Sequence, residues 1–280
     1  MQEHYTRWVE QIESLCGSAN VGHVDVVVDQ AAWDVSLLPA LRLMEPGMRW
    51  FSLFSATPEE ALLTQAPILM RINLDDWRHK AWLEELIEQV GHLPRLMLLI
   101  SPMPFDVLAK SLQGLSQLEW GGQSGLLRFY DPRVMPEVLA SVLSPEQKEQ
   151  FLRVTLFWSW LNRDQQPVWQ PGTYRSNQPL AETFPPINLA DAQFDRLGSI
   201  SDAQNLFEVA RARFSELSHE QCFACCYRVV LQASQENYFG DLKLYAELHW
   251  SRADVVWLIG LSCLLSNTSG FMPNFGANKE

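Results

Sequence analysis

Short apolar stretches alternate with amphipathic ones along the first 160 residues, and this alternation restricts the chain to a few fold classes. The apolar stretches have the length of strands. The segments between them repeat apolar residues every three or four positions, which is typical of helices. Strands that alternate with helices predict an α/β fold, in which a mixed or parallel sheet is flanked by helices. The stretches that we expect to form strands are 24–28, 48–54, 67–72, 96–101 and 126–130.

The last of these strands, 126–130, is predicted to run directly into a helix over residues 132–143. Apolar and polar side chains alternate along the strand, with the period of two that strands have. Asp131 takes the expected N-cap position, where a carboxylate accepts free N–H groups of the first helical turn. Pro132 follows at the first helical position, where its missing N–H leaves no bond unmade.

The residues at this junction, Arg128-Phe129-Tyr130-Asp131-Pro132-Arg133, resemble the signature of a family first catalogued as a domain of unknown function. That family supplies adaptor chaperones of bacterial type VI secretion. Three other segments, 26–31, 66–72 and 145–151, resemble further parts of the family in the same order. The resemblance extends over roughly residues 24–155, which is the usual size of one domain. It implies a chain that binds a toxic effector protein and loads it onto the VgrG spike.

Four residues match the polar positions of the signature: Arg128, Tyr130, Asp131 and Arg133. The resemblance carries over no catalytic residue, because the family is not known for enzymes. Two roles therefore remain open for these four side chains. They hold the junction between strand and helix together, or they contact a partner protein directly.

The amino-acid composition restricts the classes of partner that this chain is expected to bind. The formal charge is −12 at pH 7, and such a chain should be repelled by phosphate backbones, so we expect no nucleic-acid partner. The most apolar run, residues 255–265, is shorter than the ~20 residues that a membrane helix needs, so we expect no membrane association. The first ten residues are polar and charged and do not resemble a signal peptide, which predicts a cytoplasmic protein.

Three cysteines and a histidine are spaced as zinc ligands are, at His219, Cys222, Cys225 and Cys226. The cysteines also recur with apolar residues at three- and four-residue steps, as on one buried helix face. A structural zinc site normally adds a second ligand pair from another segment, and the sequence offers none. We therefore expect these cysteines to pack in a core and predict neither a metal nor a cofactor.

Two other functions stay open. An enzyme, hydrolytic or metal-dependent, would need acidic and imidazole groups to converge in one pocket, and Asp29, Asp75, His79 and Asp131 lie near expected strand ends. A scaffold component that binds the spike protein without any cargo is the third candidate. We expect the adaptor, which is not an enzyme.

The second half of the chain differs in character from the first. Residues 1–160 are predicted to form the α/β adaptor lobe, 161–188 a proline-rich linker or extended crossing segment, and 189–280 a smaller all-helical lobe. Most of the large aromatic residues in this half should lie in the core, and one or two could be exposed for a partner. The tryptophans concerned are Trp158, Trp160, Trp169, Trp250 and Trp257.

Overall fold

The structure, a computed structural model, describes residues 3–31, 33, 36–45, 47–177 and 184–250. The chain divides into two compact units, unit 1 (residues 1–197) and unit 2 (residues 198–280). The boundary between the units falls within a long helix, α7 (Asp191–Arg213), rather than at the predicted junction at residue 188.

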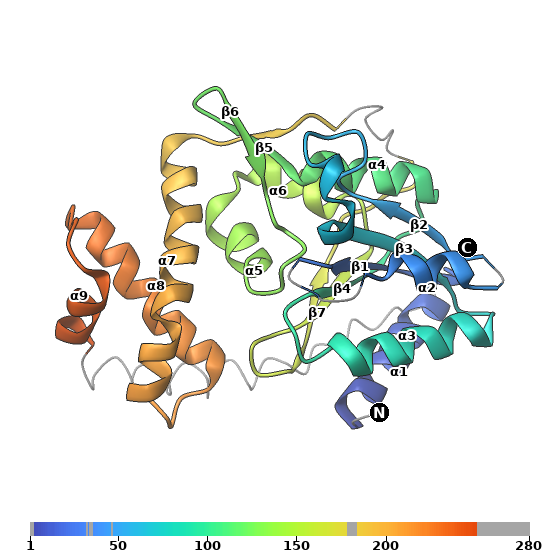
Figure 1. Ribbon diagram of the computed structural model, residues 1–280, viewed down its shortest axis with the longest axis horizontal. Helices are drawn as coiled ribbons and strands as arrows, with labels where there is room; N and C mark the ends of the chain where they lie inside the picture. Colours follow the sequence, from blue (N-terminus) through green and yellow to red (C-terminus); the bar gives the residue numbers. More distant parts are fainter. Residues whose placement is uncertain (1–2, 32, 34–35, 46, 178–183, 251–280) are drawn as a thin grey trace, which may run out of the picture. The chain divides into compact units, whose positions relative to one another are not determined.

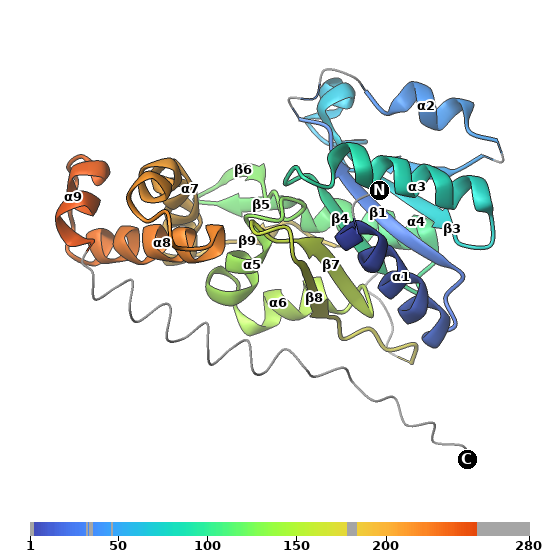
Figure 2. The ribbon, with the colours of Figure 1, turned by 90° about the horizontal axis from the view of Figure 1, so that it is seen from below.

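Six strands of unit 1 form one sheet in which every neighbouring pair is antiparallel. Their segments are rich in β-branched, aromatic and other apolar side chains, which suit a pleated and buried surface. The order across the sheet is β2-β3-β1-β4-β7-β8 (Figure 1; β8 is labelled in Figure 2). The strands are β1 (His23–Asp29), β2 (Arg49–Ser52), β3 (Pro67–Asn73), β4 (Leu96–Ile100), β7 (Phe157–Leu161) and β8 (Pro167–Pro171).

The first four strands have the split βαβ topology of ferredoxin-like domains. The connection from β1 to β2 passes over β3, and the connection from β3 to β4 passes over β1. Each connection therefore joins two strands that point the same way, while an antiparallel strand lies between them. The alternation of strands and helices along the sequence does not show that an antiparallel strand is inserted between each such pair. For this reason the sequence did not decide whether the sheet is parallel or mixed.

One face of the sheet is covered by α1 (Glu3–Ser18), α2 (Leu38–Leu43) and α3 (Trp77–Val90), whose apolar side chains share one core with alternate residues of the strands. Figure 2 shows α1 and α3 on this face. An ion pair of 2.7 Å between Lys80 and Glu13 joins the two helices. The N-cap of α3 is Asp76, whose side chain accepts a hydrogen bond from the backbone N–H of Arg78.

The opposite face of the sheet carries the remaining strand side chains and packs against α4 (Phe105–Leu115) and an aromatic cluster. Trp158 of β7 lies opposite Leu99 of β4, and Leu99 lies opposite Asp25 of β1, so all three point to this face. The ring of Phe129 meets the rings of Trp158 and Phe151 edge to face. This second core brings together segments that are distant in the sequence.

A second, three-stranded sheet consists of β5 (Gln117–Trp120), β6 (Gln123–Leu126) and β9 (Ile187–Asn188). β5 pairs with β6 in antiparallel fashion and with β9 in parallel. The predicted fold class is confirmed, because a sheet with flanking helices in the N-terminal part is followed by helices in the C-terminal part. Parallel pairing, which the sequence left open for the main sheet, occurs between β5 and β9.

The predicted strand at 126–130 and helix at 132–143 are wrong in their bounds. The strand β6 ends at Leu126, and the chain turns irregularly until α5 (Met135–Glu137), which continues as a π-helical turn over Val138–Val142. The reason is Pro136, which stands in the first turn of α5; a helix that began at Pro132 would carry this proline in its interior, where it lacks an N–H and clashes with the preceding turn. The next helix is α6 (Pro145–Leu152), which begins with a capping box at Ser144.

The segment 161–188, predicted as a linker or an extended crossing segment, contributes β8 to the main sheet and β9 to the small sheet. Trp169 of β8 packs against the core beneath α1 and α3. The described part of unit 2 consists of the end of α7, α8 (His219–Gln235) and α9 (Leu242–His249). Residues 251–280 of the predicted helical lobe lie outside the described residues.

Candidate functional site

The segment that resembles a family signature lies in a loop, the signature loop (Leu127–Val134), between β6 and α5. Phe129 anchors the loop, because its fully buried ring makes edge-to-face contacts of 5.5–5.9 Å with Tyr130, Phe151 and Trp158. The backbone N–H of Leu127 donates to the carbonyl of Ser116 at 2.8 Å, which ties the start of the loop to the end of α4.

Arg128 reaches from the signature loop to the end of β1, where its guanidinium donates to Asp29 Oδ2 at 2.7 Å. The Asp29 side chain is only 4 % exposed, whereas that of Arg128 is 48 % exposed. Asp29 Oδ1 accepts a second bond, of 2.9 Å, from the backbone N–H of Ala31. The carboxylate is therefore held inside the protein, and the arginine that neutralises its charge is half in solvent.

Tyr130 is buried beside this ion pair. Burial raises the pKa of its hydroxyl well above the ordinary range, and the nearby Asp29 carboxylate raises it further, while Arg128 opposes the shift. Tyr130 is therefore neutral at any physiological pH, and it acts as a packed side chain with one polar end.

Asp131 closes the signature loop rather than capping a helix. Its carboxylate accepts bonds from the backbone N–H of Arg133 at 2.9 Å and from the Arg133 guanidinium at 2.8 Å. Arg163, which follows β7, donates to the carbonyl of Arg133 at 2.9 Å. Asp131 is 3 % exposed and Arg133 is 37 % exposed. Of the four signature side chains, Tyr130 and Asp131 are therefore buried, whereas Arg128 and Arg133 reach the surface.

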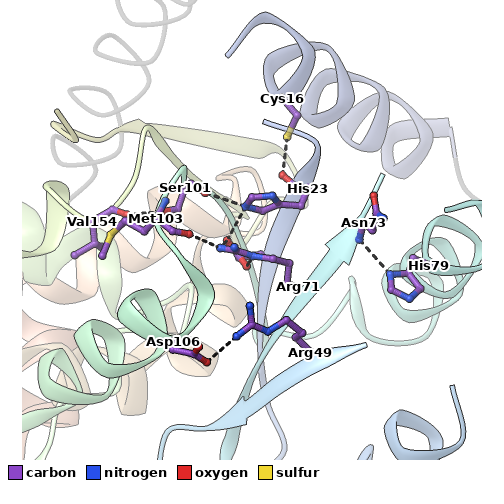
Figure 3. Close-up of polar contacts among 11 residues, drawn as sticks. Cys16, His23, Arg49, Arg71, Asn73, His79, Ser101, Met103, Asp106 and Val154 are labelled. Carbon is purple, nitrogen blue, oxygen red and sulfur yellow. Dashed lines mark hydrogen bonds and ion pairs between the residues drawn. The ribbon is translucent and has the colours of Figure 1, made fainter. Parts of the chain in front are cut away.

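A second polar cluster lies on the same face of the sheet, near the start of β1 (Figure 3). Arg71 of β3 forms a bidentate pair with the fully buried Asp25 of β1, at 2.7 and 2.8 Å, and also donates to the carbonyl of Met103 at 3.0 Å. His23 Nε2 lies 3.0 Å from the carbonyl oxygen of Ser101. Sequence reasoning missed this cluster, although a charged residue inside each of two apolar strands was the signal for it.

The electrostatics of this cluster follow from its burial. Burial raises the pKa of Asp25 to about 6, against the opposing attraction of Arg71. Burial also lowers the pKa of His23, which keeps the imidazole neutral, and raises the pKa of the Cys16 thiol to about 12. The exposed neighbour of the cluster is Arg49, which pairs with Asp106 at 2.7 Å (Figure 3).

The acidic and imidazole groups proposed for an enzyme do not meet in one place. Asp29 and Asp131 both attract the Arg128 guanidinium electrostatically, so these two carboxylates lie near the same arginine. His79 accepts a bond from the N–H of Asn73 at the other end of β3. Asn73 pairs with His23 and Pro67 with Asp29, so about six residues, roughly 20 Å of strand, separate the two ends. In a parallel sheet the carboxyl ends of the strands would lie together at one edge, but β1 and β3 are antiparallel and their carboxyl ends lie at opposite edges.

The cysteines of α8 lie on its buried face, as the spacing predicted. Cys222, Cys225 and Cys226 are fully buried, together with Val229 and Val230. Cys222 Sγ lies 3.6 Å from the carbonyl oxygen of Phe214, within the core of unit 2. Among the described residues, no group of three or more His, Cys, Asp or Glu side chains is arranged to hold a metal ion.

Of the five tryptophans considered, Trp158, Trp160 and Trp250 are buried and Trp169 is partly buried. Trp257 lies outside the described residues. Among the described residues, the tryptophan with a largely exposed side chain is Trp77, at the start of α3, which the sequence did not single out. Its neighbour Arg78 places its guanidinium 5.1 Å from the ring centre.

Comparison with known proteins gives one match. Residues 26–150, which run from the middle of β1 through the signature loop to most of α6, match the family model described as a domain of unknown function (DUF4123). This domain family is known in effector adaptors of type VI secretion systems. No curated protein and no solved structure matches the chain significantly. Within the described residues, no helix combines the length and the apolar character that crossing a bilayer requires.

Proposed function

We propose that this chain is a non-enzymatic adaptor chaperone, which binds a toxic effector of type VI secretion in the cytoplasm and loads it onto the VgrG spike. The observation that carries the proposal is the match of residues 26–150 to a domain family known in such adaptors. The signature loop lies inside the matched region, on the second core of unit 1.

The exposed halves of Arg128 and Arg133 are the partner contacts in this proposal, and Tyr130 and Asp131 position them. Arginine is enriched at protein interfaces, because its planar guanidinium forms several directed hydrogen bonds to a partner. Each guanidinium is already paired with a carboxylate of its own chain. The free adaptor therefore holds no uncompensated charge at this place after its partner leaves, which suits a carrier that must release its cargo.

The local chemistry favours binding over catalysis. A general acid or base must reach a substrate and titrate near the working pH. Asp25 has a raised pKa but no exposed surface, and Asp29 and Asp131 are each held by an arginine. A scaffold that binds the spike alone has the same local chemistry and differs from the adaptor only in its partners.

The test is to co-express the chain with the toxin encoded beside it, and separately with the spike protein, and to measure capture of each. The double variant Asp29→Asn/Arg128→Gln removes the ion pair of the signature loop. Arg49→Gln/Asp106→Asn is the matched control, because it removes another arginine–aspartate pair of 2.7 Å from the same unit. We expect the first variant to weaken capture of one partner at least tenfold and the second to leave both unchanged.

Capture of the spike without the toxin would establish the scaffold instead. Equal solubility and equal delivery of the toxin with and without this chain would refute the adaptor function. Equal capture by the two double variants would leave the adaptor function standing but would remove the signature loop from the interface.

A further inference from the structure

The hairpin of β5 and β6 leaves one edge of the small sheet open (Figure 1). Trp120 and Gln123 face each other across a two-residue turn, in which Gly121 and Gly122 both have positive φ. Such a turn holds two strands in tight antiparallel register. Among the described residues, β5 has β6 on one side and β9 on the other, whereas β6 has β5 as its single strand neighbour. β6 is therefore an edge strand.

The register shows which backbone groups of β6 point to the open edge. The N–H of Leu127 donates to the carbonyl of Ser116 just beyond the paired strands, and bonded pairs alternate along an antiparallel ladder. Ser124 and Leu126 therefore turn their N–H and C=O groups away from β5. Glu119, opposite Ser124, follows the same alternation, because its carbonyl accepts a bond of 2.8 Å from the chain after β9.

These outward backbone groups are available to another chain. Within the described part of the protein, no hydrogen bond occupies the outward N–H and C=O groups of Ser124 and Leu126. Gln123 and Ser124 are exposed, and Gly125 and Leu126 are partly buried. Ser124 and Leu126 are two residues apart, roughly 7 Å along the strand, which is the spacing at which a further strand forms its bonds.

The two edges of the main sheet are less open than β6. In β8 the alternation of bonds turns Pro167, Trp169 and Pro171 outward, and the two prolines have no N–H to donate. In β2 the outward carbonyl of Ser52 already accepts a bond from the N–H of Ser55. β6 contains neither a proline nor a charged side chain, the usual means by which proteins protect an edge strand. An edge without such protection indicates a site for strand pairing.

We propose that an extended segment of the effector adds to β6 as a fourth strand of the small sheet, bonded to the backbone of Ser124 and Leu126. This inference rests on the proposed adaptor function and names the place at which the cargo binds. β6 runs directly into the signature loop, so Leu126 and the half-exposed Arg128 are two residues apart in the chain. The open edge thus continues into the contact that the adaptor proposal already assigns to the partner.

Charge favours an effector segment over a second copy of this chain. The formal charge is −12, so two copies repel each other. Glu119 is exposed and lies opposite Ser124, so its strand position is two strand spacings, about 10 Å, from the residue that an added strand places beside Ser124. A lysine or arginine side chain spans that distance to the carboxylate. The bound segment should therefore carry basic side chains, and no proline at its bonding positions.

Co-expression of the full-length variant Ser124→Pro with the toxin encoded beside this chain tests the edge. Proline removes an outward N–H but leaves the bonds between β5 and β6 intact, because Ser124 makes none of them. Ser124→Ala is the matched control, since it removes the hydroxyl and keeps the N–H. We expect the proline variant to lower capture of the toxin at least tenfold and the alanine variant to leave it unchanged. Protection of the Gly125 amide reports in each variant that the hairpin is still paired.

Hydrogen exchange of the wild-type chain, resolved by residue with NMR, is a second measurement that needs no substitution. In the free chain the amides of Ser124 and Leu126 should exchange rapidly, whereas the amide of Gly125 between them is bonded to β5 and should be protected. Addition of the purified toxin should slow exchange at Ser124 and Leu126 at least tenfold. This alternation distinguishes strand addition from a contact that covers the hairpin with side chains alone.

The other outcomes overturn the proposal in distinguishable ways. Equal capture of the toxin by wild type and Ser124→Pro, or amides of Ser124 and Leu126 that the toxin does not slow, would overturn the strand addition and leave the adaptor function standing. Loss of spike capture alone would assign the edge to the spike protein instead. Protection that rises with protein concentration in the isolated chain would assign it to a second copy. A wild-type chain that captures neither toxin nor spike would refute the adaptor function itself.

Discussion

Arg128→Gln should destabilise unit 1 more than Asp29→Asn does, although both substitutions break the same ion pair. The reason is the unequal burial of the partners, with Asp29 4 % exposed and Arg128 48 % exposed. Arg128→Gln leaves a buried carboxylate whose remaining bond is the one from the Ala31 N–H. Asp29→Asn leaves a guanidinium that can turn into water, while the asparagine oxygen can still accept the bond from Ala31.

The magnitude follows from the same geometry. A hydrogen bond to a charged group contributes about 1.5–3 kcal/mol, and a buried charge left without its partner adds a desolvation penalty. Since half of Arg128 is in solvent, screening reduces the value, and we expect about 2–3 kcal/mol for Arg128→Gln. Asp29→Asn should cost about 1 kcal/mol, and so should the double variant. The coupling energy of the cycle then has a magnitude of about 2–3 kcal/mol.

Native-state hydrogen exchange of the β1 amides measures the loss of stability in each variant, because it reports the opening free energy of unit 1 separately from that of unit 2. A thermal melt should agree, with a fall of ~4–12 °C for Arg128→Gln, taking about 2–4 °C per kcal/mol for a unit of this size. An Asp29→Asn variant that loses as much stability as Arg128→Gln, or a coupling energy below about 0.5 kcal/mol, would refute the argument from unequal burial.

Three further predictions concern unit 1. Because burial raises the pKa of Asp25 from 3.8 to about 6, the stability linked to this group is fully present below about pH 4 and is lost as the pH rises through 6, by on the order of 3 kcal/mol. A pH series of the unfolding free energy should show this slope, and Asp25→Asn should abolish it. Phe129→Ala should destabilise by about 3–5 kcal/mol in urea unfolding, whereas Phe239→Ala, at a 94 % exposed ring, should change little. Gly172→Ala should cost about 1–3 kcal/mol, because the new Cβ would lie 1.9 Å from the Thr155 carbonyl oxygen; a melt like that of wild type would contradict this.

Local signals in the sequence located many elements well. The apolar runs at 24–28, 67–72 and 96–101 each identify a strand from neighbouring residues alone, and these strands are β1, β3 and β4. The cysteines of α8 were placed on a buried face for the same reason, since helical spacing depends only on residues within a few turns. The helix after the signature loop was misplaced because one local signal, Pro132, was weighed without a second, Pro136.

Local signals do not predict how distant segments of the chain pair with one another. No local pattern states that β3 lies between β1 and β2, and this insertion makes the main sheet antiparallel and keeps His79 away from Asp29. The partners of the buried charges were equally hidden. Asp25 meets Arg71, and Asp29 meets Arg128, across 46 and 99 residues of chain.

The amino-acid sequence by itself determined the kinds of element, the α/β class and the likeness of the signature to an adaptor family, because these depend on short-range spacing and residue type. The tertiary structure decided which signature side chains are buried and which reach the surface. That division depends on what each side chain meets in space: Arg128 and Arg133 extend past their buried carboxylates into solvent, while Tyr130 and Asp131 are enclosed.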